Sequence, residues 1–316
     1  MGIEAEMYTL EAVVALLERE RFPEDIKSIL IDVARKLVYR MNEYINELSI
    51  EDSSLRNAIS HLLGRGKFLR GIFSYIVGRA LGAEEDPIIT LAVSSEFYHT
   101  ASLIHDDIID RACTRRGVET VHEKYGLERA IIAGDALIIY PNYILSKLGG
   151  EVIKTFAKAG LKLCDGEALE LIYTNNLDEV DLETYNKIVY KKTAAFFEHI
   201  MEAVAIISDK REYTNTLSSL GRYLGMAFQY RDDMLDVIGD PRLMGKPVGN
   251  DENKPNLIHV LMREYKISVE EALERAYKLI TRYVEKAIAI LNDLPLSPFD
   301  RRLLVTLARS LSNRVI

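Results

Sequence analysis

The chain has 316 residues, of which 48% are hydrophobic and 28% charged, and its formal net charge is −8. This is the balance of a folded globular protein, and the length allows a sizeable core. The acidic charge argues against a nucleic-acid partner, but it allows small anionic substrates if local cations or metal ions receive them. Two cysteines, Cys113 and Cys164, have no CxxC spacing and predict neither a disulfide framework nor a zinc site.

The first residues, MGIEAEMYTLEAVV, contain early acids and no basic stretch, so we expect no secretory signal. No run approaches the roughly 18 apolar residues that a membrane span needs. We therefore expect a cytoplasmic protein without a membrane span. Abundant Lys, Arg and Glu, with Gln229 as the only glutamine, indicate a thermophilic source.

Apolar residues recur at three- and four-residue steps along most of the chain, which is the period of amphipathic helices. In chain order the expected helices cover residues 9–19, 24–48, 67–82, 87–110, 128–148, 150–174, 181–208, 213–238, 268–292 and 298–313. The sequence has no convincing alternating strands, long linker or internal repeat. The pattern predicts an all-α fold with a single domain over residues 1–316.

The longest irregular stretch, residues 237–256, holds three prolines and three glycines. Loops of this length are often lids or binding loops, so we expect a lid here. A tolerated surface insertion is the alternative.

The strongest chemical signals are two DDxxD clusters, which contain Asp106, Asp107, Asp110, Asp232, Asp233 and Asp236. Positions i and i+4 lie one above the other on a helix, so each cluster should aim two or three carboxylates into one space at the inner end of a buried helix. Buried like charges are costly unless compensated, and Mg²⁺ binds one or two carboxylates together with phosphate oxygens. The clusters predict magnesium sites, and exposed acidic helix ends are the alternative.

Basic residues in short motifs supply donors for the phosphates of such a site. They are Lys67 and Arg70 in GKFLR, His99 two turns before Asp106, Arg115 and Arg116 after the first cluster, Lys192 before Thr193, and Lys246 in the expected lid. Lys67 and Arg70 are expected on one face of a helix. Singly, such residues are usually solvated or structural. Together they form two cationic sets, which fits two diphosphates in one cavity.

In this order the motifs resemble those of the trans-isoprenyl diphosphate synthases, the farnesyl/geranylgeranyl diphosphate synthase family. The resemblance covers nearly the whole chain, from GRGKFLRG through HTASLIHDDIID, RRG, AGDALI, YKKTAAFF and GMAFQYRDDMLD to GKPVGND. It implies an isoprenoid synthase fold, with helices around a deep central cavity, and usually a homodimer. It also implies a Mg²⁺-dependent enzyme that condenses isopentenyl diphosphate with an allylic diphosphate.

The resemblance further implies roles for individual residues. The six aspartates would hold about three Mg²⁺ on the allylic diphosphate. The same diphosphate would contact Arg115, Lys192 and Lys246. Isopentenyl diphosphate would contact Lys67, Arg70, His99 and Arg116. The developing carbocation would face the side-chain oxygens of Thr193 and Gln229.

The sequence departs from the family at three places. Only two residues separate Asp251 from Lys254, where about four are usual, which puts the role of Lys254 in question. Asn256 stands where Thr is common, and Gly166 is followed by Glu167 where Gln is frequent.

Product length is expected to depend on the helix that carries the first cluster, because a growing prenyl tail should run beside it. Ala101 and Ser102, just before Asp106, are small. Tyr98, one turn deeper, is a candidate for the floor, the residue that closes the end of the tunnel for the prenyl tail. A turn rises about 5.4 Å, comparable to one isoprene unit. A floor at Tyr98 favours the twenty-carbon geranylgeranyl product. The alternatives are that Tyr98 faces a neighbouring helix, or that the product is farnesyl or longer, with twenty-five carbons and above.

Three other functions share part of this pattern. A class I terpene cyclase consumes one diphosphate and has no use for a second cationic set. A non-catalytic regulatory subunit of the family should have lost an aspartate cluster, and both are intact here. An acidic helical scaffold explains neither the basic motifs nor the expected lid. The sequence therefore favours the chain-elongating prenyltransferase.

Overall fold

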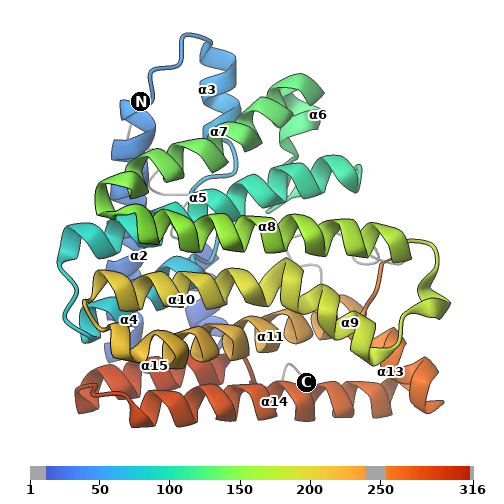
Figure 1. The fold of residues 1–316 in the computed structure, drawn as a ribbon. Helices are drawn as coiled ribbons and strands as arrows, with labels where there is room; N and C mark the ends of the chain where they lie inside the picture. The colour runs from blue at the N-terminus through green and yellow to red at the C-terminus, as the bar shows by residue number, and fades with distance from the viewer. Residues whose placement is uncertain (1–11, 239–253, 314–316) are drawn as a thin grey trace. The chain divides into compact units, whose positions relative to one another are not determined.

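The computed structural model describes residues 12–238 and 254–313, and it is helical almost throughout (Figure 1). Residue contacts divide the chain into two compact units, Met1–Ile153 and Lys154–Ile316. The all-α fold predicted from the sequence is confirmed. The single-domain organisation over residues 1–316 and the central cavity stay predictions.

In the first unit, a helical segment at residues 12–19 is followed by a series of helices. They are α2 (Glu24–Glu47), α3 (Ser53–Ser60), α4 (Leu69–Ala80), α5 (Glu85–Ile109), α6 (Val121–Tyr125) and α7 (Leu127–Leu145), followed by the 3₁₀ turn η1 (Ser146–Leu148). In this unit α5 packs against α4 and α7, while α3 and α6 lie beside α7 (Figure 1). Among the described residues the strands are limited to β1 (Thr114–Arg115) and β2 (Val118–Glu119), an antiparallel hairpin.

Helix α5 occupies the middle of the first unit because its sequence has no solvated stripe. Buried side chains occur on all of its faces between Ile88 and Ile104. Its first turn is tied to two other helices: Glu85 accepts a hydrogen bond from the Tyr75 hydroxyl of α4 at 2.7 Å and forms an ion pair with Lys36 of α2 at 2.7 Å. The first aspartate cluster therefore lies on a helix held along its length.

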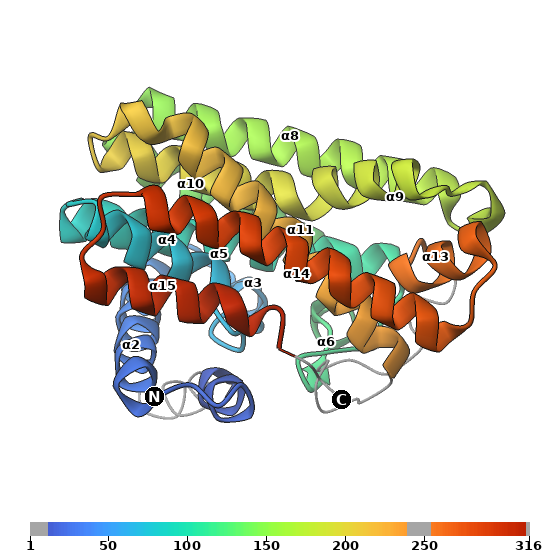
Figure 2. The same cartoon turned by 90° about the horizontal axis from the view of Figure 1, so that it is seen from below.

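The second unit takes most of α8 and the rest of the chain. Its elements are α8 (Gly150–Tyr173), η2 (Leu177–Glu179), α9 (Leu182–Val189), the π-helical turn η3 (Tyr190–Ala194), α10 (Ala195–Ile207), η4 (Arg211–Tyr213), α11 (Thr214–Ile238), α13 (Leu257–Tyr265), α14 (Val269–Asp293) and α15 (Pro298–Ser310). Helix α11 packs against α10 and α14, and α13 lies beside α9 and α14 (Figure 2).

Two glycines of α11 let its backbone come into close contact with the backbone of neighbouring elements. A Cβ atom added to Gly221 would lie 2.3 Å from the Phe197 carbonyl oxygen on α10. A Cβ atom added to Gly225 would lie 2.5 Å from the Ala194 Cα in η3. Any larger residue would have to push the helices apart, which costs packing energy.

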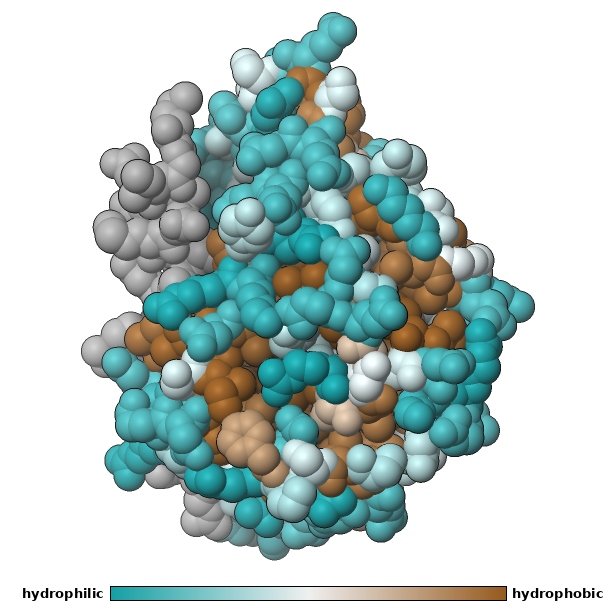
Figure 3. Space-filling model, turned by 90° about the vertical axis from the view of Figure 1, so that its left-hand side faces the viewer, coloured by the Kyte–Doolittle hydropathy of each residue, from teal (hydrophilic) through white to brown (hydrophobic). Residues whose placement is uncertain are grey.

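The structure adds short elements that the sequence analysis missed. Helices α3, α6 and α13 have 8, 5 and 9 residues, too few for apolar repeats to stand out. No helix in the described residues is long and apolar enough to cross a bilayer. On the face drawn in Figure 3, apolar side chains reach the surface in small groups separated by polar ones, as is normal for folded proteins.

Candidate functional site

The first aspartate cluster lies at the C-terminal end of α5. Asp106 and Asp107 are in its last turn and Asp110 is its C-cap, and that turn contains no basic residue. The helix macrodipole places partial negative charge at this end, so the carboxylates add to a potential that is already negative. An end of this kind attracts cations.

Asp107 is the buried member of the cluster, and Arg115 is its ion-pair partner. Arg115 Nε and Nη2 both donate to Asp107 Oδ1, at 2.7 and 2.5 Å. Burial raises the pKa of Asp107, and the charge of Arg115 opposes that rise. Asp107 Oδ2 is buried and accepts no hydrogen bond from the described part of the chain. That oxygen is open to a cation or a ligand donor.

The β1–β2 hairpin positions two arginines. Its turn residues, Arg116 and Gly117, have φ values of 51° and 75°, the positive pair of a type I′ turn. Positive φ is strained for arginine, and the side chain is held by a hydrogen bond from Arg116 Nη1 to the Leu62 carbonyl oxygen at 2.9 Å. A Cβ atom at Gly66 would lie 2.9 Å from Arg116 Nη2, so glycine makes room for the guanidinium.

The structure brings Arg70, His99, Arg115 and Arg116 together in the first unit. Arg70 is 8% exposed and lies in the first turn of α4. Burial, and then the charges of Arg70, Arg116 and Arg115, lower the pKa of His99 well below its usual value. Burial also lowers the pKa of Arg116, to about 10, which leaves the guanidinium charged at neutral pH. The result is a cationic cluster around a neutral imidazole.

The prediction that Lys67 and Arg70 share a helix face is wrong. Helix α4 begins at Leu69, and its N-cap, Phe68, has a φ of 51°. The backbone therefore turns between Lys67 and the helix. Lys67 is half-buried on the approach to α4 rather than on it.

Sequence analysis missed Glu96, a buried carboxylate on α5. Phe68 supplies no side-chain cap to α4, and Glu96 Oε1 accepts a hydrogen bond from the Gly71 N–H at 2.8 Å instead. Burial raises the pKa of Glu96, while Gly71 and the charges of Arg70 and Arg116 lower it. Glu96 thus fixes the helical turn that carries Arg70. The available signal was one acid inside the apolar run LAVSSEFYH.

The second aspartate cluster lies at the C-terminal end of α11, again with no basic residue in the last turn. Asp232 is exposed, Asp233 is buried and Asp236 is half-buried. The prediction that the carboxylates lie at the inner end of the helix is therefore wrong for Asp232, because adjacent helical residues point in different directions.

Asp233 is the centre of a hydrogen-bond network. Its Oδ2 accepts from the Tyr185 hydroxyl at 2.6 Å and the Leu257 N–H at 2.7 Å, and its Oδ1 accepts from Gln229 Nε2 at 2.8 Å. Burial raises the pKa of Asp233 to about 7, and these three donors oppose the rise. Thr193 Oγ1 donates to Gln229 Oε1 at 2.9 Å. The network fixes which end of the Gln229 amide faces Thr193.

Asn256 joins the end of α11 to the start of α13. Its side-chain Nδ2 donates to the Asp233 carbonyl oxygen at 3.2 Å, and its Oδ1 accepts from the Ile258 N–H at 2.9 Å as the N-cap of α13. Asparagine is among the most favoured N-cap residues. The departure from threonine at this position therefore keeps the cap.

Lys192 and Thr193 lie in the π-helical turn η3, which interrupts the helix expected over residues 181–208. Such turns are frequent at functional sites. Gly166 of α8 lies against it, since an added Cβ atom would be 2.5 Å from the Lys192 nitrogen. Together with Gly225 of α11, this glycine lets two helices enclose the widened turn.

Two glutamates of α8 hold the Lys192 ammonium. Lys192 Nζ lies 2.7 Å from Glu167 Oε2 and 2.5 Å from Glu170 Oε2. Lys254 Nζ lies 3.4 Å from the same Glu170 oxygen. Lys246 and most of the expected lid lie outside the described residues.

The three residues expected to control chain length lie on α5. Ala101 is fully buried, and Ser102 donates from Oγ to the His99 carbonyl oxygen at 2.8 Å. Burial raises the pKa of Tyr98 to about 12, and a hydrogen bond with the Asn142 side chain partly opposes the rise. Tyr98 therefore contacts α7, the neighbouring helix that the alternative interpretation invoked. Its role as a floor stays a prediction.

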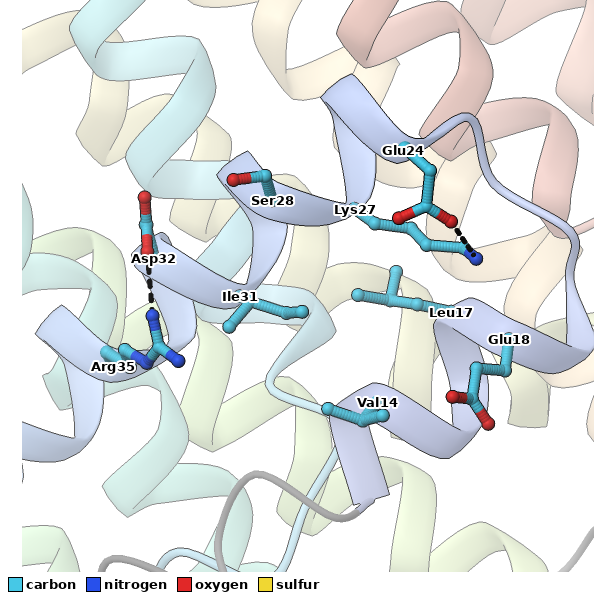
Figure 4. Close-up of a pocket in the computed structure, with 9 residues that line it drawn as sticks. All are labelled: Val14, Leu17, Glu18, Glu24, Lys27, Ser28, Ile31, Asp32 and Arg35. Carbon is cyan, nitrogen blue, oxygen red and sulfur yellow. Dashed lines mark hydrogen bonds and ion pairs between the residues drawn. The ribbon is translucent and has the colours of Figure 1, made fainter.

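The pocket drawn in Figure 4 contains none of these residues. It has a volume of about 380 Å³, and its apolar side chains are Val14, Leu17 and Ile31. Ion pairs between Lys27 and Glu24 and between Arg35 and Asp32 flank it, at 2.7 and 3.1 Å. In residues 12–238 and 254–313, no group of three or more His, Cys, Asp or Glu side chains converges closely enough to hold a metal ion.

Comparisons with known proteins agree on one family. A family model described as "Polyprenyl synthetase" matches residues 52–294. The octaprenyl diphosphate synthase of Escherichia coli is 34% identical over 223 residues, covering 69% of each chain. The geranylfarnesyl diphosphate synthase of Aeropyrum pernix is 37% identical over 225 residues, covering 67% of this chain and 70% of the relative.

Solved structures give the same result. The geranylgeranyl pyrophosphate synthetase of Pyrococcus horikoshii superposes with a TM-score of 0.82 at 30% identity, covering 92% of this chain and 99% of that one. A polyprenyl synthase from Caulobacter crescentus, complexed with calcium and isoprenyl diphosphate, has a TM-score of 0.80 at 26% identity, covering 90% and 97%.

The neutral His99 predicts a pH dependence of stability. In the unfolded chain the imidazole binds a proton near pH 6.5, whereas in the folded chain its lowered pKa prevents this. The unfolded state then binds more protons, so the free energy of unfolding falls as pH drops below about 6.5. We expect His99→Gln to remove this loss, which is at most about 1.4 kcal/mol per pH unit for one proton.

Urea unfolding of both proteins between pH 5 and 8, without substrate or metal, measures the difference. His259→Gln, at an exposed histidine, is the control and should follow the unmodified protein. Parallel pH profiles for the His99 variant and the unmodified protein would contradict the prediction.

Proposed function

The chain belongs to the polyprenyl synthetase family and is a trans-prenyltransferase, and from that premise we propose that it condenses isopentenyl diphosphate with an allylic diphosphate to give geranylgeranyl diphosphate. The observation that carries the proposal is the pair of aspartate clusters, each at the C-terminal end of a long helix without a basic residue in its last turn. Metal-bound diphosphate is a ligand suited to such ends.

The aspartate clusters would hold Mg²⁺ together with the substrate. Asp107 Oδ2 is buried and accepts no hydrogen bond from the described residues, so it is suited to a cation. The described residues contain no group of three or more carboxylates close enough to hold a metal ion. Diphosphate oxygens would therefore complete the coordination, which is the usual arrangement for Mg²⁺. Bound Mg²⁺ would spread the charge of the leaving diphosphate and ease cleavage of its C–O bond. Asp233, with three donors already in place, would contribute mainly by orienting Gln229.

The basic residues divide into two sets in this proposal. Isopentenyl diphosphate would be received by Lys67, Arg70, His99 and Arg116. Arg116 stays charged, and neutral His99 adds a donor without adding charge. The allylic diphosphate would be received by Arg115, Lys192 and Lys246.

Thr193 and Gln229 would act on the allylic carbocation. The hydrogen bond from Thr193 Oγ1 satisfies one lone pair of Gln229 Oε1, and Asp233 holds the amide NH₂ on the other side. The oxygens of both side chains are thereby prepositioned for positive charge, which avoids reorganisation during the reaction. The isopentenyl double bond then attacks the cation, and its proton leaves to the departed diphosphate.

The length of the product is proposed from residues of α5. Ala101 and Ser102 have small side chains and would leave room for the first part of the prenyl tail beside α5, and Tyr98 lies one turn deeper. We propose that Tyr98, held by Asn142, ends the tunnel at the twenty-carbon product. A longer product is the second candidate, because relatives include octaprenyl and geranylfarnesyl diphosphate synthases. The cytoplasmic location stays a prediction.

Incubation with labelled isopentenyl diphosphate, farnesyl diphosphate and Mg²⁺ tests the chemistry. We expect label in a twenty-carbon alcohol after dephosphorylation, and loss of incorporation of at least about 100-fold when EDTA removes the metal, because unneutralised diphosphate is a poor leaving group. Geranyl and dimethylallyl diphosphates serve as alternative primers. If no primer is elongated, the chain is a regulatory subunit; if farnesyl diphosphate is consumed in a run without isopentenyl diphosphate, it is a cyclase.

Tyr98→Ala tests the floor. Removing the ring and the Asn142 contact should lengthen the main product by at least one isoprene unit, measured by sizing the dephosphorylated alcohols. Phe97→Leu, at the adjacent buried aromatic of α5, is the control and should keep the product length. An unchanged product in the Tyr98 variant would assign chain length to other residues.

We also propose a homodimer formed through α7. Along this helix Leu127, Ile131, Ile139 and Tyr143 are spaced by four, eight and four residues, with Asp135 between the two pairs, and are 48%, 44%, 66% and 64% exposed. A group of exposed apolar residues on one helix is typical of an interface, and a twofold dimer is the commonest assembly. Ile139→Lys should shift the mass in analytical ultracentrifugation from dimer to monomer. Tyr39→Lys, at an α2 residue that is 62% exposed, should not. A monomeric unmodified protein would contradict the proposal.

A further inference from the structure

The Lys192 ammonium is held by two carboxylates at once. Glu167 and Glu170 are three residues apart on α8, so their side chains lie on the same helix face. Their side chains are 14% and 11% exposed, and both oxygens lie within 2.7 Å of Lys192 Nζ. At this burial the attraction is much less screened than that of a surface pair.

The two carboxylates are not equivalent. Glu170 Oε2 lies 2.5 Å from Lys192 Nζ and 3.4 Å from Lys254 Nζ, so it holds two lysines together. Glu167 Oε2 lies 2.7 Å from Lys192 Nζ. Lys192 is also fixed through its backbone, because Gly166 brings α8 against the Lys192 nitrogen. We therefore expect Glu170 and the π turn to keep Lys192 in place when the charge of Glu167 is removed.

A charged residue at position 167 opposes an anionic ligand of Lys192. A diphosphate that reaches this ammonium comes close to the Glu167 carboxylate, and like charges in a partly buried site repel. Glutamine has nearly the same shape as glutamate and still accepts a hydrogen bond, but it adds no negative charge.

We propose that Glu167 is a positioning residue that competes with the allylic diphosphate for Lys192 and thereby weakens the binding of that diphosphate. This inference rests on the proposed function, in which Lys192 contacts the allylic substrate. Each elongated product is itself an allylic diphosphate, so the same competition favours its release. Glu167 would thus act on how long a chain stays bound between additions.

Glu167→Gln tests the competition by two independent measurements. Titration calorimetry with inorganic pyrophosphate in EDTA should give a dissociation constant about three- to tenfold lower than for the unmodified protein, because one repulsive charge is removed. In steady-state kinetics with Mg²⁺, the KM for farnesyl diphosphate should fall by a similar factor. The KM for isopentenyl diphosphate should change by less than about twofold, since Lys192 is not among its proposed contacts. The kcat should stay the same or fall.

Two further variants separate charge from structure. Asp165→Asn removes the same charge from the same helix, but Asp165 pairs with Lys191, at 2.7 Å, and is 57% exposed, so both measurements should stay unchanged. Glu167→Asp keeps the charge on a shorter side chain and should not tighten pyrophosphate binding.

Unchanged or weaker pyrophosphate binding in Glu167→Gln overturns the proposal. A lower melting temperature together with weaker binding would show that Glu167 merely holds Lys192 in place, and an equal gain in Asp165→Asn would show a general charge effect; both overturn it. If the unmodified protein elongates no primer, the proposed function fails, whereas the pyrophosphate titration still reports on Glu167.

Discussion

The desolvation of carboxylates at the ends of two long helices is the constraint on which both aspartate clusters depend. Asp107 and Asp233 are buried where the macrodipole already places negative charge. Leaving such groups without donors would cost several kcal/mol, on the order of a large part of a protein's net stability. The neighbouring residues can be understood as the donors that this constraint requires.

The two units meet the constraint with different chemistry. In the first, Arg115 supplies a full positive charge, delivered by a tight hairpin whose turn contains a strained arginine. In the second, a tyrosine hydroxyl, an amide and a backbone N–H supply only dipoles. Asp233 consequently has a pKa raised to about 7, whereas Asp107 keeps a charged partner and an open oxygen. The first arrangement is suited to binding a cation, and the second to orienting its neighbours.

Sequence patterns predicted the long helices well because each presents several apolar repeats, and short motifs brought the aspartates and arginines forward as candidate site residues. They missed what depends on contacts between distant residues. Glu96 and Tyr185 look ordinary in sequence, and each acquires its role only from a partner more than twenty residues away. The π turn was invisible because its sequence, YKKTA, continues the helical period. Lys67 was wrongly placed on the helix because the sequence GKFLR gives no indication of the positive φ of Phe68.

The π turn also has a consequence for how the chain tolerates changes in length. A π turn holds about one residue more than an α-helical turn over nearly the same rotation. If one residue were lost from Tyr190–Ala194, the turn would become a regular helix, and α9 and α10 would keep nearly the same relative orientation. The side chains within the turn, Lys192 and Thr193 among them, would point in new directions. Insertions and deletions should therefore be excluded from this segment among relatives that keep the site, even where surface loops vary freely.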